Sequence, residues 1–140
     1  MERHPLERLC ERVRTGEALV AGVLSGTSAD GIDVALVRFD GDAGRGLLRA
    51  PRVAAFETRA FPRALRARVR AVLDGAPTGL RETALLSRDL GIAFGQAVKE
   101  VARAHGLEPE LVGSHGQTVW HHDGAEASGP ASLQLGDGDF

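Results

Sequence analysis

The sequence predicts an α/β domain with a mixed sheet, in which a three-stranded antiparallel meander is followed by a helical crossover to a parallel strand. Two observations support this prediction. Three apolar runs joined by short turns occupy residues 18–61, and such short connections favour antiparallel pairing. Two helical stretches then precede a further strand that is predicted to begin at Glu110, and a return after a long helical crossover implies parallel pairing.

Composition fits one domain and argues against several classes of function. The chain has 140 residues, of which 43% are hydrophobic, so it can bury a core. A formal net charge of −2 argues against bulk binding to nucleic acid or to an acidic membrane surface, and no apolar run is long enough for a membrane span. Its one cysteine, Cys10, permits no internal disulfide, and the N-terminus lacks the apolar stretch of an export signal. We therefore expect a cytoplasmic protein.

The first element is predicted to be a short amphipathic helix that ends near Thr15–Gly16. We treat residues 1–16 as a helical extension that docks on the body of the chain, residues 17–140. The apolar positions that recur at helical spacing are Leu6, Leu9, Cys10 and Val13.

The meander comes next. Residues 18–24 are continuously apolar, which predicts a strand buried on both faces. A turn of small and polar residues, 25–31, leads into a second strand over 32–40. A turn over 39–44 then leads into a third strand over 47–61, weakened at its proline.

A helix is predicted to begin at Pro62, since proline suits the first helical turn. One face of this helix carries Arg63, Arg66 and Arg70. This row of arginines has two readings, an anion site or a solvated helix face, and the second is favoured because no aromatic residues are interleaved.

A longer helix is predicted from about Leu80 to His105. Its apolar stripe consists of Leu86, Leu90, Ala93, Ala97 and Val101. Gly91 and Gly95 lie four residues apart on one face, although glycine is unfavourable within helices. The pair therefore predicts a close approach to a strand or another helix.

The turn between the first two strands contains more polar groups than a hairpin requires. It contains two glycines, two hydroxyls and two carboxylates, namely Gly26, Gly31, Thr27, Ser28, Asp30 and Asp33. Backbone N–H groups and hydroxyls can hold phosphate, while a carboxylate organises Mg²⁺ through water. An ordinary polar hairpin is the alternative, and the residues of the turn alone leave both open.

A second polar stretch, residues 113–122, follows the predicted fourth strand. His115 and Gln117 are two residues apart, so they are expected to share a face and could bind a polyhydroxylated ligand. A zinc site is the sharper alternative, but its spacing matches no familiar ligand pattern, and a surface histidine pair is favoured. The zinc ligands would be His115, His121, His122 and Asp123.

A third stretch, residues 134–138, reads Gln-Leu-Gly-Asp-Gly. It could line a pocket or form a simple turn. Alone it predicts no function.

Together, the stretches GVLSGTSADGID, GSHGQTVWHH and SLQLGDGD resemble the N-terminal lobe of the anhydro-N-acetylmuramic acid kinases. The resemblance covers about Ala18 to Phe140. It implies the actin-like (ribonuclease H-like) ATPase fold, whose lobes each carry a five-stranded mixed sheet. It also implies an activity, in which ATP and Mg²⁺ are used to convert 1,6-anhydro-N-acetylmuramic acid and water to N-acetylmuramic acid 6-phosphate during peptidoglycan recycling.

Site residues follow from the matching motifs. The resemblance places His115, Gln117 and Thr118 near the sugar. The wider superfamily has a metal-handling aspartate where Leu24 stands here, and Asp30 is our candidate substitute for binding Mg²⁺ through water. The ATP phosphates would contact Gly26, Thr27, Ser28, Ala29, Asp30, Gly31, Ile32 and Asp33.

The resemblance also limits what these residues could do alone. The catalytic base is expected in an Asp-Phe-Arg stretch beyond Phe140, so we expect a truncated N-terminal lobe that leaves apolar surface uncovered and is inactive by itself. Its partner would be a small-molecule amino sugar, and a homodimer stays open. The alternative function is a non-catalytic nucleotide-binding module or an inactive remnant of a sugar kinase.

Overall fold

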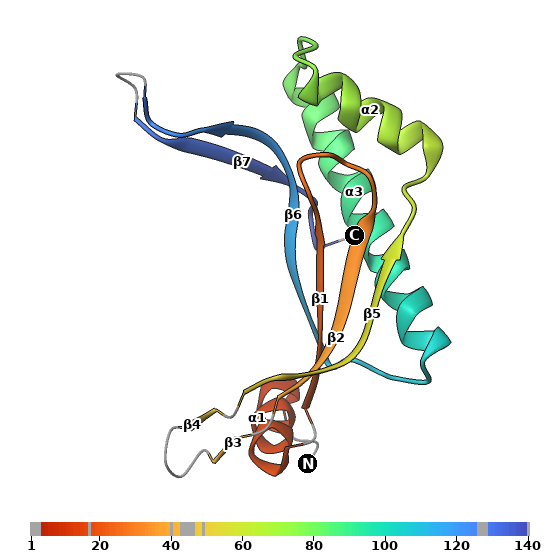
Figure 1. Ribbon diagram of the computed structural model, residues 1–140, viewed down its shortest axis with the longest axis vertical. Helices are drawn as coiled ribbons and strands as arrows, with labels where there is room; N and C mark the ends of the chain where they lie inside the picture. The colour runs from red at the N-terminus through yellow and green to blue at the C-terminus, as the bar shows by residue number, and fades with distance from the viewer. Residues whose placement is uncertain are drawn as a thin grey trace.

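The computed structural model describes residues 4–16, 18–39, 41–42, 47–48, 50–125 and 129–139. Ten helices and strands lie within these ranges (Figure 1). They are α1 Pro5–Thr15, β1 Ala18–Ser25, β2 Ile32–Phe39, β3 Gly41–Asp42, β4 Leu47–Leu48, β5 Arg52–Arg59, α2 Arg63–Leu73, α3 Leu80–Ala104, β6 Leu111–His122 and β7 Ala131–Leu135.

The main sheet has five strands in the order β5-β2-β1-β6-β7. β1 pairs antiparallel with β2, and β2 pairs antiparallel with β5, which completes the meander. After α2 and α3, β6 returns beside β1 and runs parallel to it, whereas β7 folds back antiparallel on β6. The predicted α/β fold, with its meander and helical crossover, is therefore confirmed.

The predicted third strand is shorter than expected. In place of one strand over residues 47–61, the structure has the short β4 and then β5, with Pro51 immediately before β5. Proline has no N–H to donate to a ladder, and pairing with β2 is confined to β5, from Arg52 onward, whereas β4 pairs with β3. Of the predicted turn over 39–44, Asp40 and residues 43–44 lie outside the described residues.

One face of the sheet is covered by α3, and α2 lies on the same side (Figure 1). The five predicted stripe residues of α3 are all buried, and α2 adds Leu65 and Val69. These side chains pack on alternate residues of β1 and β2, including Val23 and Val34. Burial of such aliphatic side chains is the main favourable contribution to folding.

The opposite face of the sheet is open among the described residues, which corrects the prediction that the first strand is buried on both faces. Burial alternates along β1, and Leu24 is 43% exposed. On β5, Phe56 is 60% exposed. The reason is that both long helices lie on one side, so the other side of β1 is not covered by them. Exposed apolar side chains therefore lie on this face.

The N-terminal helix confirms the predicted element and its end at Gly16, whose φ of 74° closes the helix. None of its residues is buried, and it packs against β1. Its Arg12 also forms an ion pair with Glu110, the residue before β6. Among the described residues, no helix is long and apolar enough to cross a membrane.

Ion pairs join the two long helices. Arg68 of α2 contacts Glu82 at 2.8 Å and Asp89 at 2.5 Å, both on α3. Hydrogen bonds from Arg68, and then from Arg88, lower the pKa of the Asp89 carboxyl. The pKa of Arg68 is raised, chiefly by its hydrogen bond with Asp89. The pairs fix how α2 lies on α3.

The two glycines of α3 differ in their surroundings. A Cβ added at Gly91 would overlap the backbone carbonyl of Asp137, in the segment that follows β7. A Cβ added at Gly95 would meet no atom of the described residues within 4 Å. The predicted close approach is therefore correct at Gly91, although the neighbour is a loop and not a strand or helix, and it is wrong at Gly95.

This difference gives a matched pair of substitutions. We expect Gly91→Ala to destabilise the fold by about 1–3 kcal/mol, because overpacking must push the Asp137 segment away. Gly95→Ala should stabilise it by up to about 1 kcal/mol, because only the helix propensity changes. Urea unfolding followed by circular dichroism measures both. Equal stabilisation by the two substitutions would show that Gly91 makes no essential contact.

Candidate functional site

The turn between β1 and β2 is built around one tight hydrogen bond. The N–H of Ala29 donates to the carbonyl of Gly26 at 3.0 Å, so Thr27 and Ser28 occupy the tip. Ala29 is fully buried and has a φ of 49°, a left-handed conformation that is unfavourable for alanine. Such a conformation persists only where the surroundings hold it.

Several donors of this turn face outward. Within the described part of the chain, the N–H groups of Thr27, Ser28 and Asp30 have no hydrogen-bond partner, and all three residues are exposed. Successive unpaired N–H groups in a turn form a concavity that attracts anions. The hydroxyls of Thr27 and Ser28 add two further donors.

The end of the turn is fixed on β5. A Cβ added at Gly31 would lie 2.5 Å from Cγ2 of Thr58, so only glycine fits this close approach. The Thr58 hydroxyl donates to the Asp33 carboxylate at 2.6 Å. Between them, Ile32 is 1% exposed and belongs to the core. Of the predicted phosphate contacts, Ala29 and Ile32 thus have buried side chains and can offer a ligand only their backbone.

The beginning of the turn is held by Gln117 of β6. The side chain of Gln117 is fully buried, and its Nε2 donates to the carbonyls of Gly26 and Thr118, each at 3.0 Å. Its Oε1 is also buried and has no partner among the described residues. The Gly26 carbonyl therefore accepts from both Ala29 and Gln117, which ties the first motif to the second.

A β-bulge in β6 corrects two predictions about His115. Pairing with β1 passes from Ser114 to Gly116, which leaves His115 as the extra residue, and Gly116 has a φ of 75°. Because the bulge interrupts the alternation, His115 is exposed while Gln117 is buried, so the two do not share a face. In addition, β6 continues to His122, so the motif lies within the strand and not at its end.

The third motif packs against the bulge and against α3. A Cβ added at Gly116 would lie 2.6 Å from the Leu135 carbonyl, so β7 approaches closely here. The N–H of Gly136 donates to Oγ of Ser87 at 3.1 Å, and the N–H of Asp137 donates to the Ser87 carbonyl at 3.1 Å. Gln134 and Leu135 thus end β7 beside the second motif, and the residues that follow them dock on α3.

Two further residues, Thr118 and Ser87, lie near the contact between the second and third motifs. Thr118, a predicted sugar contact, is half-buried, and its Oγ1 accepts from Nε2 of Gln134 at 3.5 Å. Ser87 was not predicted to contribute. The only signal for it was its position four residues before Gly91, on the same side of α3.

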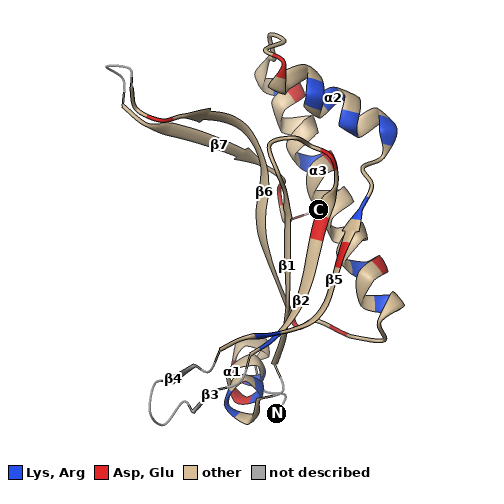
Figure 2. Ribbon diagram, viewed as in Figure 1, with Lys and Arg blue, Asp and Glu red and all other residues tan. Residues whose placement is uncertain are grey.

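The arginine row on α2 (Figure 2) contacts the turn between β1 and β2. Nε of Arg66 donates to the Ala29 carbonyl at 3.0 Å, and its Nη2 contacts the Asp30 carboxylate at 3.1 Å. Nη1 of Arg70 donates to the Ser28 carbonyl at 3.2 Å. The side chains of Arg66 and Arg70 are still 49% and 47% exposed, so the predicted solvated helix face is present, and its bonds to the turn were not predicted.

The histidines do not form a metal site in this structure. Among the described residues, no group of three or more His, Cys, Asp or Glu side chains lies together as metal ligands would. The Nδ1 atom of His122 instead accepts from the N–H of Gly124 at 2.8 Å. The zinc alternative therefore has no support from the geometry.

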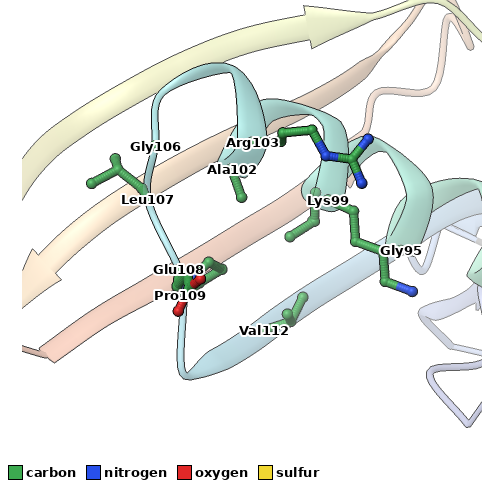
Figure 3. A pocket seen from close by; sticks show the side chains of 10 residues that line it. Gly95, Lys99, Ala102, Arg103, Gly106, Leu107, Glu108, Pro109 and Val112 are labelled. Carbon is green, nitrogen blue, oxygen red and sulfur yellow. The ribbon is translucent and has the colours of Figure 1, made fainter.

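A groove with a volume of about 720 Å³ lies elsewhere (Figure 3). It runs between the C-terminal half of α3 and the first residues of β6, and its lining includes Lys99, Arg103 and Val112. Val112 pairs with Ala21 near the start of β1, whereas the turn follows the end of that strand. None of the predicted site residues lines this groove.

Comparison with known proteins bears on the three motifs. A family model described as anhydro-N-acetylmuramic acid kinase matches residues 18–140. A relative of that name from Gloeobacter violaceus is 37% identical over 125 residues, which cover 86% of this chain and 32% of the relative. Relatives of the same name from Synechococcus elongatus and Bacillus cereus (strain AH820) are 40% and 36% identical, over 84% of this chain and 30% and 31% of their own lengths.

The chain thus spans about a third of the length of the curated relatives that it matches. The match begins where β1 begins and includes all three motifs of the candidate site. The five-stranded mixed sheet is also consistent with an actin-like ATPase lobe. The chain belongs to the anhydro-N-acetylmuramic acid kinase family.

Proposed function

We propose that this chain supplies the phosphate-binding half of an ATP-dependent kinase that acts on 1,6-anhydro-N-acetylmuramic acid. The observation that carries the proposal is the turn over 26–31. Its outward N–H groups have no partner in the described chain, while β5, β6 and α2 hold its other groups in place. A preorganised set of donors suits the β- and γ-phosphates of ATP, where charge develops during transfer.

The proposed reaction joins hydrolysis to phosphate transfer. Water adds across the 1,6-anhydro bond, O6 becomes free, and O6 receives the γ-phosphoryl group of ATP. The products are ADP and N-acetylmuramic acid 6-phosphate, which peptidoglycan recycling would consume. We assign the base that deprotonates the water to no residue of this chain, and we propose that the chain alone binds nucleotide without transferring phosphate.

Magnesium would be held mainly by the phosphates, with Asp30 accepting a hydrogen bond from a metal-bound water. Oδ1 of Asp30 contacts Arg66, and the Asp30 side chain is 73% exposed. One oxygen can therefore hold Arg66 while the other faces solvent. We propose Mg²⁺ and ATP together as the ligands of this turn.

The sugar would lie on the β6 side of the turn, near His115, Gln117 and Thr118. The exposed His115 and the half-buried Thr118 can offer hydrogen bonds to hydroxyl groups. Nε2 of Gln117 is already used twice, and its Oε1 is buried and has no partner among the described residues, so Gln117 would support the sugar side of the site through the backbone that it holds. We propose residues 17–140 as the phosphate-binding lobe, residues 1–16 as its extension, and the cytoplasm, which supplies ATP, as the compartment.

A chimera tests the proposed activity. The present chain would replace the matched segment of the Synechococcus elongatus relative, which is 40% identical to it over 120 residues. We expect the chimera to transfer phosphate from ATP to 1,6-anhydro-N-acetylmuramic acid, because the motifs of this chain would complete the cleft. Release of ADP and formation of the 6-phosphate product, followed by mass spectrometry, are the measurements.

The chain alone is the matched control, and it should bind ATP·Mg²⁺ without forming product. If the chimera transferred phosphate only to another sugar, the proposed substrate would be wrong, but the proposed kinase activity would stand. A folded chimera that binds ATP but transfers to no sugar would favour the inactive remnant.

The role of Asp30 is tested in the same chimera with Asp30→Asn, which keeps an oxygen that can accept from Arg66. Loss of the carboxylate charge should raise the Mg²⁺ concentration for half-maximal turnover about tenfold, as expected for one charge-assisted hydrogen bond. Asp123→Asn, at an exposed aspartate outside the turn, serves as the control. An unchanged Mg²⁺ dependence in Asp30→Asn would remove Asp30 from the metal site.

A further inference from the structure

The carbonyl groups on the α2 side of the turn each accept a bond from an arginine. Arg66 bonds the Ala29 carbonyl through Nε and the Asp30 carboxylate through Nη2. Arg70 bonds the Ser28 carbonyl through Nη1. These two helix residues, four positions apart and therefore on one side of α2, thus reach consecutive peptide groups of the turn.

The direction of these bonds sets the direction of the N–H groups. In a trans peptide the C=O and the following N–H point in opposite directions. Since the Ala29 carbonyl points to Arg66, the N–H of Asp30 points away from α2, where it has no partner in the described chain. The Ser28 carbonyl points to Arg70, and the N–H of the same peptide, on Ala29, points back to Gly26.

The left-handed conformation of Ala29 needs such support. Ala29 lacks the freedom of glycine, and its φ of 49° would relax if nothing held its neighbouring peptides. The planar guanidinium of Arg66 meets two acceptors at once, which the single ammonium of a lysine could not reproduce in the same geometry.

We propose that Arg66 and Arg70 are positioning residues, which hold the Ser28 and Ala29 carbonyls so that the turn presents its N–H groups to a phosphate ligand. The inference rests on the proposed function for its ligand, ATP·Mg²⁺. The part of the inference that concerns the shape of the turn is independent of the proposed function, because that shape can be measured without nucleotide.

The experiment compares four variants of the 140-residue chain. Arg66→Met and Arg70→Met remove the bonds to the turn and keep a flexible apolar side chain, while Arg66→Lys keeps the charge. Arg63→Met is the matched control, because Arg63 lies on the same helix and, among the described residues, forms no hydrogen bond or ion pair with the turn. Two quantities are measured, namely the hydrogen-exchange rate of the Ala29 amide without ligand and the Kd for ATP·Mg²⁺ by calorimetry.

Arg66→Met should raise the exchange rate of the Ala29 amide and the Kd for ATP·Mg²⁺ about tenfold each, the size expected for one lost charge-assisted hydrogen bond. Arg66→Lys should resemble Arg66→Met in both, and Arg63→Met should resemble the parent chain. Arg70→Met should raise both quantities in the same direction, and it decides the question if Arg66→Met fails to fold.

Two results would overturn the proposal. One is an unchanged Ala29 exchange rate in both methionine variants. The other is Arg66→Lys behaving as the parent chain in both measurements, because charge near the ligand would then explain the effect. If the parent chain binds no ATP·Mg²⁺, the proposed function fails, yet a rise in Ala29 exchange would still support the role of the arginines in shaping the turn.

Discussion

The hydrogen bond from the Gln117 amide to the Gly26 carbonyl is the interaction on which the candidate site depends. It joins a turn near the start of the chain to a strand 91 residues later, and both of its atoms lie in a part-buried setting where water competes poorly. Gln117 can face the turn only because β6 bulges at His115 and Gly116. The bulge therefore has a functional consequence, since a regular strand would turn the amide to the other face.

Close backbone approach keeps this arrangement compact. Gly116 admits the Leu135 carbonyl, Gly91 admits the Asp137 carbonyl, and Gly31 admits Thr58. At each position a side chain would separate two elements that must meet. The three motifs are far apart along the chain, yet they form one continuous structure in which each fixes the backbone of the next. This connection gives the turn support from β5, β6 and α2 that does not depend on a bound ligand.

Much of the fold was predictable, because hydrophobic periodicity and turn residues report local structure directly. The meander, the crossover and the stripe of α3 followed from these patterns. The bulge was not predicted, because the prediction for His115 and Gln117 assumed that side chains alternate regularly between the two faces of the strand. The partners of Arg66 and Arg70 were also missed, since a helical pattern shows which residues share a face and not what that face meets. The open face of β1 escaped prediction because an apolar run does not tell how many layers cover it.

The central claim is that the turn over 26–31 is the part of this chain that receives the phosphates of ATP. Amide chemical shifts of the ¹⁵N-labelled chain, recorded as ATP·Mg²⁺ is added, test it most directly. The account predicts that the largest changes occur at the outward amides of Thr27, Ser28 and Asp30. Largest changes at Lys99, Arg103 and Val112 in the groove beside α3, with the turn unaffected, would contradict it.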